Sequence, residues 1–353
     1  MTTCSSGIAA CADRDRQYSA WVTAPSPGSD EWRALVEEPV VDPEQSIVDP
    51  HHHLWRRGPF AYSLSDLLGD VHGGHRVEHT VFMECRAEYR ADGPAEFAPV
   101  GETEFVAGEA ARSDGLIAGI VGHADLRLAN LDAVLDAHVE AGSGMFRGIR
   151  DALSRADPSD GLMIAGHAPI GLSEDPDFRR GVARLGARGL TYDSWHYHFQ
   201  NREFIELARA IPDTLMVLDH FGTPIGVGRY ADQRDVIFEE WKRDIVELAR
   251  CENVVAKLGG LAMPDNGFGW HTAARPPTSD AFVAAQGPYY RHMIETFGAD
   301  RCMFESNFPV DRMSLSYRVL WNGLKKIARD YSPAERDALF AGTATRVYRL
   351  PAA

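Results

Sequence analysis

The stretch Ser46-Ile47-Val48-Asp49-Pro50-His51-His52-His53-Leu54-Trp55 predicts a buried strand that ends in three histidines. Side chains alternate between the two faces of a strand, so His51 and His53 are expected on one face and His52 on the other. Two imidazoles at i and i+2 at a strand end can bind one metal ion. We therefore predict that His51 and His53 are metal ligands and that His52 packs behind the strand. The alternative is a pair of capping or surface histidines in a polar turn.

The same pattern, an apolar run with a polar residue at its end and then an amphipathic stretch, recurs along the chain. Near-continuous hydrophobic strands that alternate with helices indicate an α/β fold, and eight repeats predict a closed (β/α)8 barrel. A doubly wound open sheet is the alternative, but no GxGxxG follows the early strands. The expected strands are Ile47–Asp49, Thr80–Glu84, Ile117–Gly122, Met145–Arg150, Leu190–Asp193, Leu215–Asp219, Asn253–Lys257 and Arg301–Glu305, and the expected helices include Asp132–Ala141, Asp177–Ala187, Arg202–Ala210, Ile237–Arg250 and Tyr289–Phe297.

Composition and charge narrow the class of protein. The 353 residues are 44% hydrophobic, enough for a packed core, and 51 acidic residues against 36 basic ones give a net charge of -15. This charge argues against nucleic acid or an anionic membrane as a partner. The five cysteines include no CxxC pair, and no export signal is visible. These features are typical of a cytoplasmic protein.

The chain divides into a polar arm, residues 1–45, and a barrel domain, residues 46–353. The arm is rich in Ser, Pro, Asp and Glu, and it carries Trp21 and Trp32 as aromatic side chains that need a surface to bury against. We expect it to lie on the barrel or on a partner subunit. A homo- or hetero-oligomer with a related barrel subunit is therefore predicted.

Histidine and glutamate side chains follow several of the expected strands, where the chemistry of a barrel gathers. His220 ends the sixth run before a glycine turn and is predicted to be a metal ligand or an acid/base group. Glu84 ends the second run and is predicted to be a ligand, unless it only pairs with a nearby arginine. His196 and His198 repeat the i, i+2 spacing, so one of them, with His198 preferred, is expected to bind the metal. His196 would then contact the substrate.

Two basic residues also lie at strand ends. Arg150 follows the fourth run and Lys257 follows the seventh. At a barrel mouth, an arginine fork and a lysine point charge would suit a substrate carboxylate. The alternative is that both form ordinary ion pairs.

Three motifs resemble the amidohydrolase superfamily, in the branch that includes sugar-acid and pyrone-dicarboxylate lactonases and metal-dependent decarboxylases. They are Asp49–Trp55 (DPHHHLW), Leu218–Gly222 (LDHFG) and Met303–Pro309 (MFESNFP). The resemblance runs from about residue 46 to residue 350. It implies a (β/α)8 barrel with metal ligands at the first-strand H-x-H, histidines after strands five and six, and an acid after strand eight.

The chain departs from this pattern in two places. Hydrolytic members have an Asp after strand eight that takes a proton from the attacking water, but the matching residue here is Asn307, whose amide can ligate but cannot take that proton. Many two-metal hydrolases bridge their ions with a modified Lys at the end of strand four, where this chain has Arg150. We accordingly predict Glu84, His220 and Asn307 as catalytic residues. The predicted ligand set is His51, His53, Glu84, His198, His220 and Asn307.

Such a nitrogen-rich set suits Zn, Fe or Mn, and six candidates suggest two adjacent ions. This is similar to the two-metal non-haem hydroxylases of the superfamily, such as 2-aminoisobutyrate hydroxylase. The preferred hypothesis is therefore O2-dependent hydroxylation of a small carboxylate-bearing substrate at an Fe or Fe/Mn pair, with electrons from an external reductase. One alternative is hydrolysis of a lactone or amide on one Zn or Mn, with His220, His198 or Glu84 as base. Another is a non-catalytic, zinc-bearing partner subunit.

Overall fold

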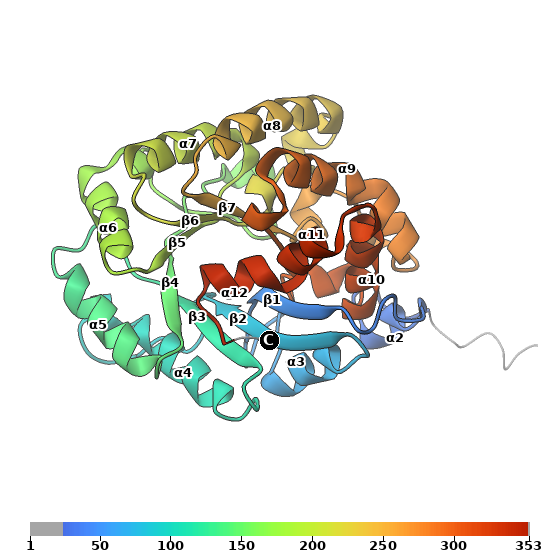
Figure 1. The fold of residues 1–353 in the computed structure, drawn as a ribbon, viewed down its shortest axis with the longest axis horizontal. Helices are drawn as coiled ribbons and strands as arrows, with labels where there is room; N and C mark the ends of the chain where they lie inside the picture. The colour runs from blue at the N-terminus through green and yellow to red at the C-terminus, as the bar shows by residue number, and fades with distance from the viewer. Residues whose placement is uncertain (1–23, 352–353) are drawn as a thin grey trace, which may run out of the picture.

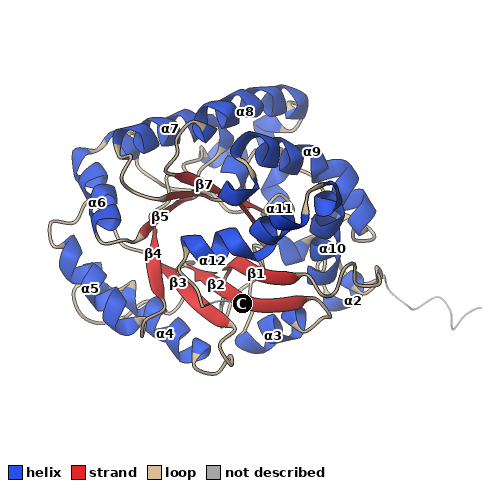
Figure 2. Ribbon diagram, viewed as in Figure 1, coloured by secondary structure: helices blue, strands red, loops and turns tan. Residues whose placement is uncertain are grey.

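Eight parallel strands form the centre of the molecule. The computed structural model describes residues 24–351. The order of the strands in the sheet follows their order in the chain, and every hydrogen-bonded pair is parallel. Figures 1 and 2 show the strands curving around a central axis with helices outside them. The strands are β1 Ser46–His52, β2 Arg76–Met83, β3 Ile117–Gly122, β4 Phe146–Arg150, β5 Thr191–Ser194, β6 Met216–Leu218, β7 Val254–Leu258 and β8 Cys302–Phe304.

The chain just after β8 closes the barrel against β1. The backbone N–H of Asn307 donates to the carbonyl of His51 over 3.0 Å, and the N–H of His53 donates to the carbonyl of Phe308 over 2.8 Å. These bonds continue the parallel ladder past the end of β8, where His52 and Phe308 form a bridge. The predicted (β/α)8 barrel is confirmed, and its closure fixes the end of β1 next to the segment that follows β8.

Helices separate the strands and cover the outside of the sheet. Several begin at a side-chain cap, such as Asp175 before Pro176 and Ser316 before Tyr317, which satisfies backbone N–H groups of the first turn. The five helices expected from the sequence are all present, with ends shifted by a few residues except in the fifth, which begins ten residues earlier. The helices are α2 Asp30–Arg33, α3 Leu64–Val71, α4 Val100–Ala110, α5 Leu131–Ala141, α6 Pro176–Ala187, α7 Asn201–Ala210, α8 Arg234–Ala249, α9 Ser279–Phe297, α10 Tyr317–Ile327, α11 Pro333–Asp337 and α12 Thr343–Val347.

Alternate strand residues build two separate apolar clusters. The larger cluster lies between the sheet and the outer helices, and it includes Ile47 and Phe82. The smaller one gathers Val48 and Val81 with Val347 and Tyr348 from the C-terminal end of the chain. Figure 1 shows α12 lying across the barrel at the centre of the view. This helix closes one end of the barrel, so polar chemistry is left to the other end, where the strands finish.

The described part of the arm, residues 24–45, packs on the outside of the same barrel. Trp32 is fully buried, and its indole N–H donates to the carbonyl of Ala273 over 2.9 Å. Glu38 accepts from the backbone N–H of Ser279 over 2.7 Å at the start of α9. Trp32 is thus buried on its own chain, so it does not supply the exposed aromatic surface from which an oligomer was predicted. Trp21 lies outside the described residues.

Among residues 24–351, no helix has both the length and the apolar character needed to cross a membrane.

Candidate metal centre and active site

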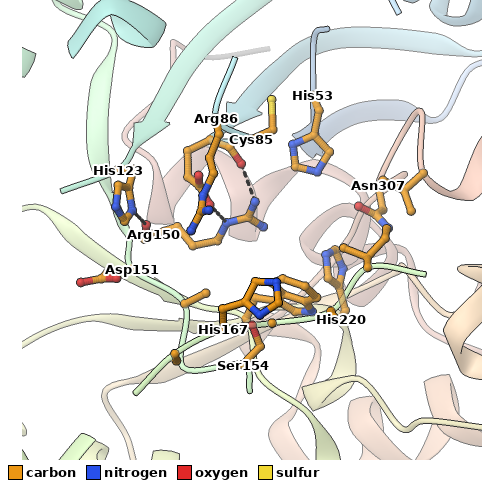
Figure 3. A pocket seen from close by; sticks show the side chains of 18 of the residues that line it. His53, Cys85, Arg86, His123, Arg150, Asp151, Ser154, His167, His220 and Asn307 are labelled. Carbon is orange, nitrogen blue, oxygen red and sulfur yellow. Dashed lines mark hydrogen bonds and ion pairs between the residues drawn. The ribbon is translucent and has the colours of Figure 1, made fainter. Parts of the chain in front are cut away.

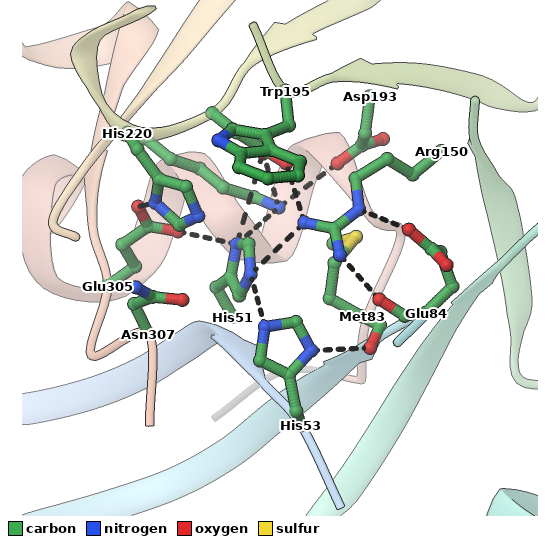
Figure 4. Close-up of polar contacts among 12 residues, drawn as sticks. His51, His53, Met83, Glu84, Arg150, Asp193, Trp195, His220, Glu305 and Asn307 are labelled. Carbon is green, nitrogen blue, oxygen red and sulfur yellow. Dashed lines mark hydrogen bonds and ion pairs between the residues drawn. The ribbon is translucent and has the colours of Figure 1, made fainter. Parts of the chain in front are cut away.

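His51 and His53 bring two imidazole nitrogens face to face. Their Nε2 atoms lie 3.2 Å apart (Figure 4). His53 Nδ1 lies 2.9 Å from the carbonyl oxygen of Met83, which can only accept, so the ring proton of His53 is on Nδ1. His51 Nδ1 lies 2.8 Å from a Glu305 carboxylate oxygen, and the negative charge of that oxygen favours a proton on Nδ1 here too. Both Nε2 atoms therefore carry a lone pair directed at the same small space.

Burial keeps both rings neutral. Burial, and after it the charge of Lys257, lowers the pKa of His51 well below its ordinary value. For His53 the causes are burial and then Arg150. Two neutral nitrogens with facing lone pairs repel each other unless a cation lies between them. Nitrogens at about 2.1 Å from one ion would be about 3.0–3.4 Å apart at bond angles of about 90–110°. The observed 3.2 Å fits one metal ion.

Glu305 orients a third imidazole together with His51. One carboxylate oxygen accepts from His220 Nδ1 over 2.6 Å, and the other faces His51 Nδ1. The His51 and His220 rings lie side by side, with centroids 4.4 Å apart. A carboxylate that holds Nδ1–H and leaves Nε2 bare is a frequent partner of metal-bound histidine. His220 is thus a third candidate nitrogen ligand beside His51 and His53.

Two glycines after β7 make room for this arrangement. A Cβ atom on Gly260, whose φ is +77°, would lie 2.4 Å from His220 Nδ1. A Cβ on Gly259 would lie 2.4 Å from Cγ of Glu305. Only glycine allows the chain to pass so close to both side chains. The backbone after β7 therefore supports the Glu305–His220 contact.

Lys257 and Arg150 lie beside the histidines, but their charges are already neutralised by carboxylates. Lys257 is fully buried, and its Nζ lies 3.1 Å from both Asp193 and Asp219. Arg150 pairs with Glu84 over 2.8 Å and with Asp219 over 3.3 Å. Asp219 is buried, which raises its pKa, but Lys257 and Arg150 outweigh burial and lower it overall. This placement argues against the predicted role of Lys257 and Arg150 in binding a substrate carboxylate; the ion-pair alternative describes them.

The charge of this cluster also suits a divalent cation. Four carboxylates and two cations meet at this end of the barrel, so the ionised cluster carries two excess negative charges. A divalent ion on the histidines would balance them. The donor atoms of His51, Asp219 and His220 lie within 4.8 Å of one another, and His53 adds a nitrogen 3.2 Å from that of His51. Because Asp219 is occupied by two cations, we take His53 instead of Asp219 as the third candidate ligand. The cluster consists of Glu84, Asp193, Asp219, Glu305, Arg150 and Lys257.

A cavity of about 660 Å³ opens onto the histidines. His53, His220 and Asn307 lie on its wall (Figure 3), and so does Glu84. The long segment after β4 contributes another part of the wall, including residues 163–169. Asp265, from the segment after β7, accepts from the backbone N–H groups of Met163 and Ile164 over 2.7 and 2.9 Å and so fixes this wall. The cavity is large enough for a small organic substrate next to a metal ion.

Glu84 and Asn307 reach the cavity but not the group of three histidines. Arg150 holds Glu84 through Nε, as the ion-pair alternative anticipated, although with an arginine other than the sequence neighbours. Asn307 donates from Nδ2 to Asp311 over 2.9 Å, which aims its amide. Burial raises the pKa of Asp311 to about 7. Both residues therefore lie where they can contact substrate or water, rather than bridge two ions.

His196 and His198 lie away from the metal histidines. His196 is fully buried, with Nδ1 3.0 Å from the Ser194 hydroxyl and Nε2 3.2 Å from the Asn201 amide oxygen. His198 Nδ1 accepts from the backbone N–H of Ile225 over 3.2 Å, and its ring packs against Tyr230. Neither histidine lines the cavity. The structure thus places neither ring where the predictions that His198 is a ligand and that His196 contacts substrate would need it, because both rings hold local structure.

Three residues of the site were missed from the sequence. Asp219 and Glu305 each stand at a strand end inside quoted motifs, and Asp193 ends the fifth run, so their position was a usable signal. What the sequence did not show is that Glu305 would join His51 to His220 or that Asp193 and Asp219 would share Lys257. These contacts connect strands that are far apart in the chain.

Comparison with known proteins agrees with this geometry. The family model described as Amidohydrolase matches residues 48–350. The chain belongs to the amidohydrolase family. The uncharacterized protein y4mH of Sinorhizobium fredii is 33% identical over 327 residues, which cover 86% of this chain and 99% of that protein. An L-fucono-1,5-lactonase of Burkholderia multivorans is 29% identical over 318 residues, 86% of this chain and 96% of the lactonase.

A solved structure adds a metal to the comparison. The crystal structure of an amidohydrolase from Burkholderia multivorans with bound zinc superposes with a TM-score of 0.69 at 26% identity, covering 86% of this chain and 99% of that one. With the three imidazoles described above, this supports a metal cofactor, and the chain is a metal-dependent enzyme of the amidohydrolase fold. The relatives favour the hydrolase alternative over the O2-dependent hydroxylation that was preferred from the sequence.

Proposed function

We propose that this amidohydrolase opens a lactone ring by hydrolysis, with one divalent ion of the zinc type held by His51, His53 and His220. The observation that carries the proposal is the pair of neutral Nε2 atoms 3.2 Å apart, of which that of His53 belongs to the wall of a substrate-sized cavity and that of His51 lies buried behind it. Relatives named L-fucono-1,5-lactonase support the lactone as the class of substrate.

A bound ion of this kind polarises the acyl carbonyl and makes water more acidic. The protein must then take a proton from the attacking water. Glu84 lies on the cavity wall, and Arg150 fixes its Oε1, which leaves Oε2 to accept that proton. The water oxygen bonds to the acyl carbon, the ring C–O bond breaks, and Glu84 returns the proton to the ring oxygen. The product is the open hydroxy acid.

The same contacts favour one ion over the two predicted from the sequence. Arg150 Nη1 lies 3.5 Å from His51 Nε2 and its Nε lies 2.8 Å from Glu84. This guanidinium holds the carboxylate that was expected to bridge a metal pair. Glu84 therefore acts as a base, and hydroxylation at an Fe or Fe/Mn pair has no geometric support among these residues.

The proposal is tested with a panel of sugar-acid 1,4- and 1,5-lactones in anaerobic buffer. We expect turnover without oxygen and about one metal equivalent per chain by elemental analysis. Glu84→Gln should keep its metal but lower kcat by about 100- to 10,000-fold, because the amide cannot accept the proton. The proposal fails if hydroxylated product appears only in the presence of O2 and a reductant, or if Glu84→Gln hydrolyses lactones as fast as the unmodified enzyme.

A further inference from the structure

The arginines on the cavity wall are not equivalent. Arg150 is neutralised by Glu84 and Asp219, and Arg127 forms a two-bond pair with Asp125 at 2.9 Å. Arg86 also lines the cavity, and Figure 3 shows its side chain extending into it. Among residues 24–351, no carboxylate lies within ion-pairing distance of the Arg86 guanidinium. Arg86 is therefore the cavity arginine whose charge the protein itself does not balance.

The backbone at Arg86 is held in an unfavourable conformation. Its φ is +62°, in the left-handed region that a residue with a long side chain seldom adopts. Such conformations persist only where the surrounding structure enforces them, and they cluster at functional sites. Here the conformation turns the chain immediately after β2 and sends the Arg86 side chain toward the cavity.

A buried carboxylate enforces this turn. Glu102, at the start of α4, is 1% exposed, and its Oε1 accepts from the backbone N–H groups of Cys85 and Ala87 over 3.0 and 2.7 Å. These two groups flank Arg86. Gly101 lets α4 approach, because a Cβ there would lie 2.6 Å from the backbone nitrogen of Arg90. Burying Glu102 costs free energy, as the rise of its pKa to about 8, caused by burial and then by Glu84, also indicates.

We propose that Arg86 binds a carboxylate of the substrate at the end remote from the bond that is broken, and that Glu102 positions it. The inference deepens the proposed lactone hydrolysis and rests on it. A planar carboxylate matches the two-donor fork of a guanidinium. The small carboxylate-bearing substrate expected from the sequence thus keeps its charge partner, but the partner is Arg86 instead of Arg150 and Lys257. The substrate class is a lactone that carries a second, free carboxylate.

The experiment compares two lactones of the same ring, one with a free carboxylate and one with a neutral hydroxymethyl group in its place. For the carboxylated lactone, Arg86→Gln should lower kcat/KM by about 10- to 100-fold, mostly through KM, since a charge-assisted hydrogen bond is lost. For the neutral lactone it should change little. Arg86→Lys should recover part of the loss. Glu102→Gln should shift the ratio between the two lactones in the same direction, but less, because its amide oxygen can still accept from both N–H groups, although more weakly than a carboxylate oxygen.

Arg90→Gln is the matched control. Arg90 lies four residues further along the same segment, pairs with exposed Glu104 and is not on the cavity wall. It should leave both lactones unaffected. The inference is overturned if Arg86→Gln lowers kcat/KM equally for both lactones, or for neither.

A binding measurement separates this inference from the proposed reaction. Calorimetric titration with glutarate, a dicarboxylate with no ring to open, should show a Kd about 10- to 100-fold higher for Arg86→Gln than for the unmodified protein and for Arg90→Gln. If this difference appears while neither lactone is opened, the carboxylate site is supported and the lactonase proposal fails. If the lactones are opened but Arg86→Gln changes neither their ratio nor glutarate binding, the carboxylate site is wrong and the lactonase proposal remains.

Discussion

The chain contains two H-x-H pairs with the same spacing, and they have different fates. β1 stays extended through His52, so the two-residue alternation holds and the Nε2 atoms of His51 and His53 meet at 3.2 Å. β5 ends at Ser194, before the second pair begins, and His198 is already the first residue of a 3-10 helix. Alternation does not apply beyond the strand. The spacing of two histidines therefore indicates a metal site only where the backbone between them is still extended.

The ring nitrogens of the two histidine pairs also differ in their hydrogen-bond partners. In the second pair, donors and acceptors of the protein satisfy the rings: Ser194 and Asn201 for His196, and Ile225 for His198. In the first pair, each Nδ1 has a partner, but the protein offers the two facing Nε2 atoms only Arg150 Nη1, 3.5 Å from that of His51. Burial is thus compensated by protein partners in one pair, whereas a bound ion would complete the compensation in the other. This difference can be tested directly.

The largest effect is expected from removing one ring of each pair. His53→Ala should reduce bound metal from about one equivalent per chain to well below half, because two nitrogen ligands remain of three. It should lower kcat/KM by about a thousandfold or more, since the ion supplies several kcal/mol of transition-state stabilisation. His198→Gln should keep both metal and activity within about threefold. Elemental analysis and lactone kinetics on the two variants check this.

The claim that only the first pair binds metal would be contradicted if His198→Gln lost its metal as fully as His53→Ala. That result would mean that the segment after β5 moves to bring His198 to the ion, against its bond to Ile225.

A smaller effect should follow from the carboxylate that orients His51 and His220. Glu305→Gln keeps the size of the side chain but replaces an acceptor oxygen with an amide that donates, so one of the two Nδ1–H groups loses its partner. Metal affinity should fall by about 10- to 100-fold. Competition with a zinc-binding dye measures this. An unchanged affinity would show that the Gly259–Gly260 backbone alone holds the ring of His220.

The sequence was sufficient for the fold and for the first pair of histidines. Eight apolar runs predicted eight strands, and the end of β1 could be located because its hydrophobic run leads directly into His51 and His53. The run Leu190–Asp193 predicted the end of β5 to within one residue, but the spacing of His196 and His198 was interpreted as if the strand continued through them. Because the backbone is no longer extended there, the spacing does not place the two rings together.

The ion-pair partners of the basic residues were harder to predict from the sequence than their places at strand ends. Arg150 and Lys257 were correctly placed at strand ends, but a strand end does not reveal which carboxylates face it across the barrel. Asp193 and Asp219 come from β5 and the end of β6, and they neutralise Lys257 from β7. Arg86, in contrast, has no such partner within the described residues, and its left-handed backbone carries no sequence signature because it is not a glycine. Such contacts depend on the register of the closed barrel.

The smallest expected effect is on stability in acid, and it tests whether His198 of the second pair is held as a neutral ring. Burial lowers the pKa of His198 to about 4, against 6.5 for an exposed histidine, so between these values the unfolded chain binds a proton that the folded chain excludes. Because the folded chain keeps this ring neutral, the free energy of unfolding decreases as the pH falls below about 6.5, by up to about 1.4 kcal/mol per pH unit. His198→Gln removes this proton. Between pH 7 and pH 5, the free energy of unfolding of the unmodified protein should thus fall by about 2 kcal/mol more than that of the variant.

Urea unfolding of the two proteins, measured at both pH values in the presence of a chelator, isolates this difference from metal release. Parallel losses in the two proteins would mean that His198 is protonated in the folded state, and a charged ring could not accept the Ile225 N–H.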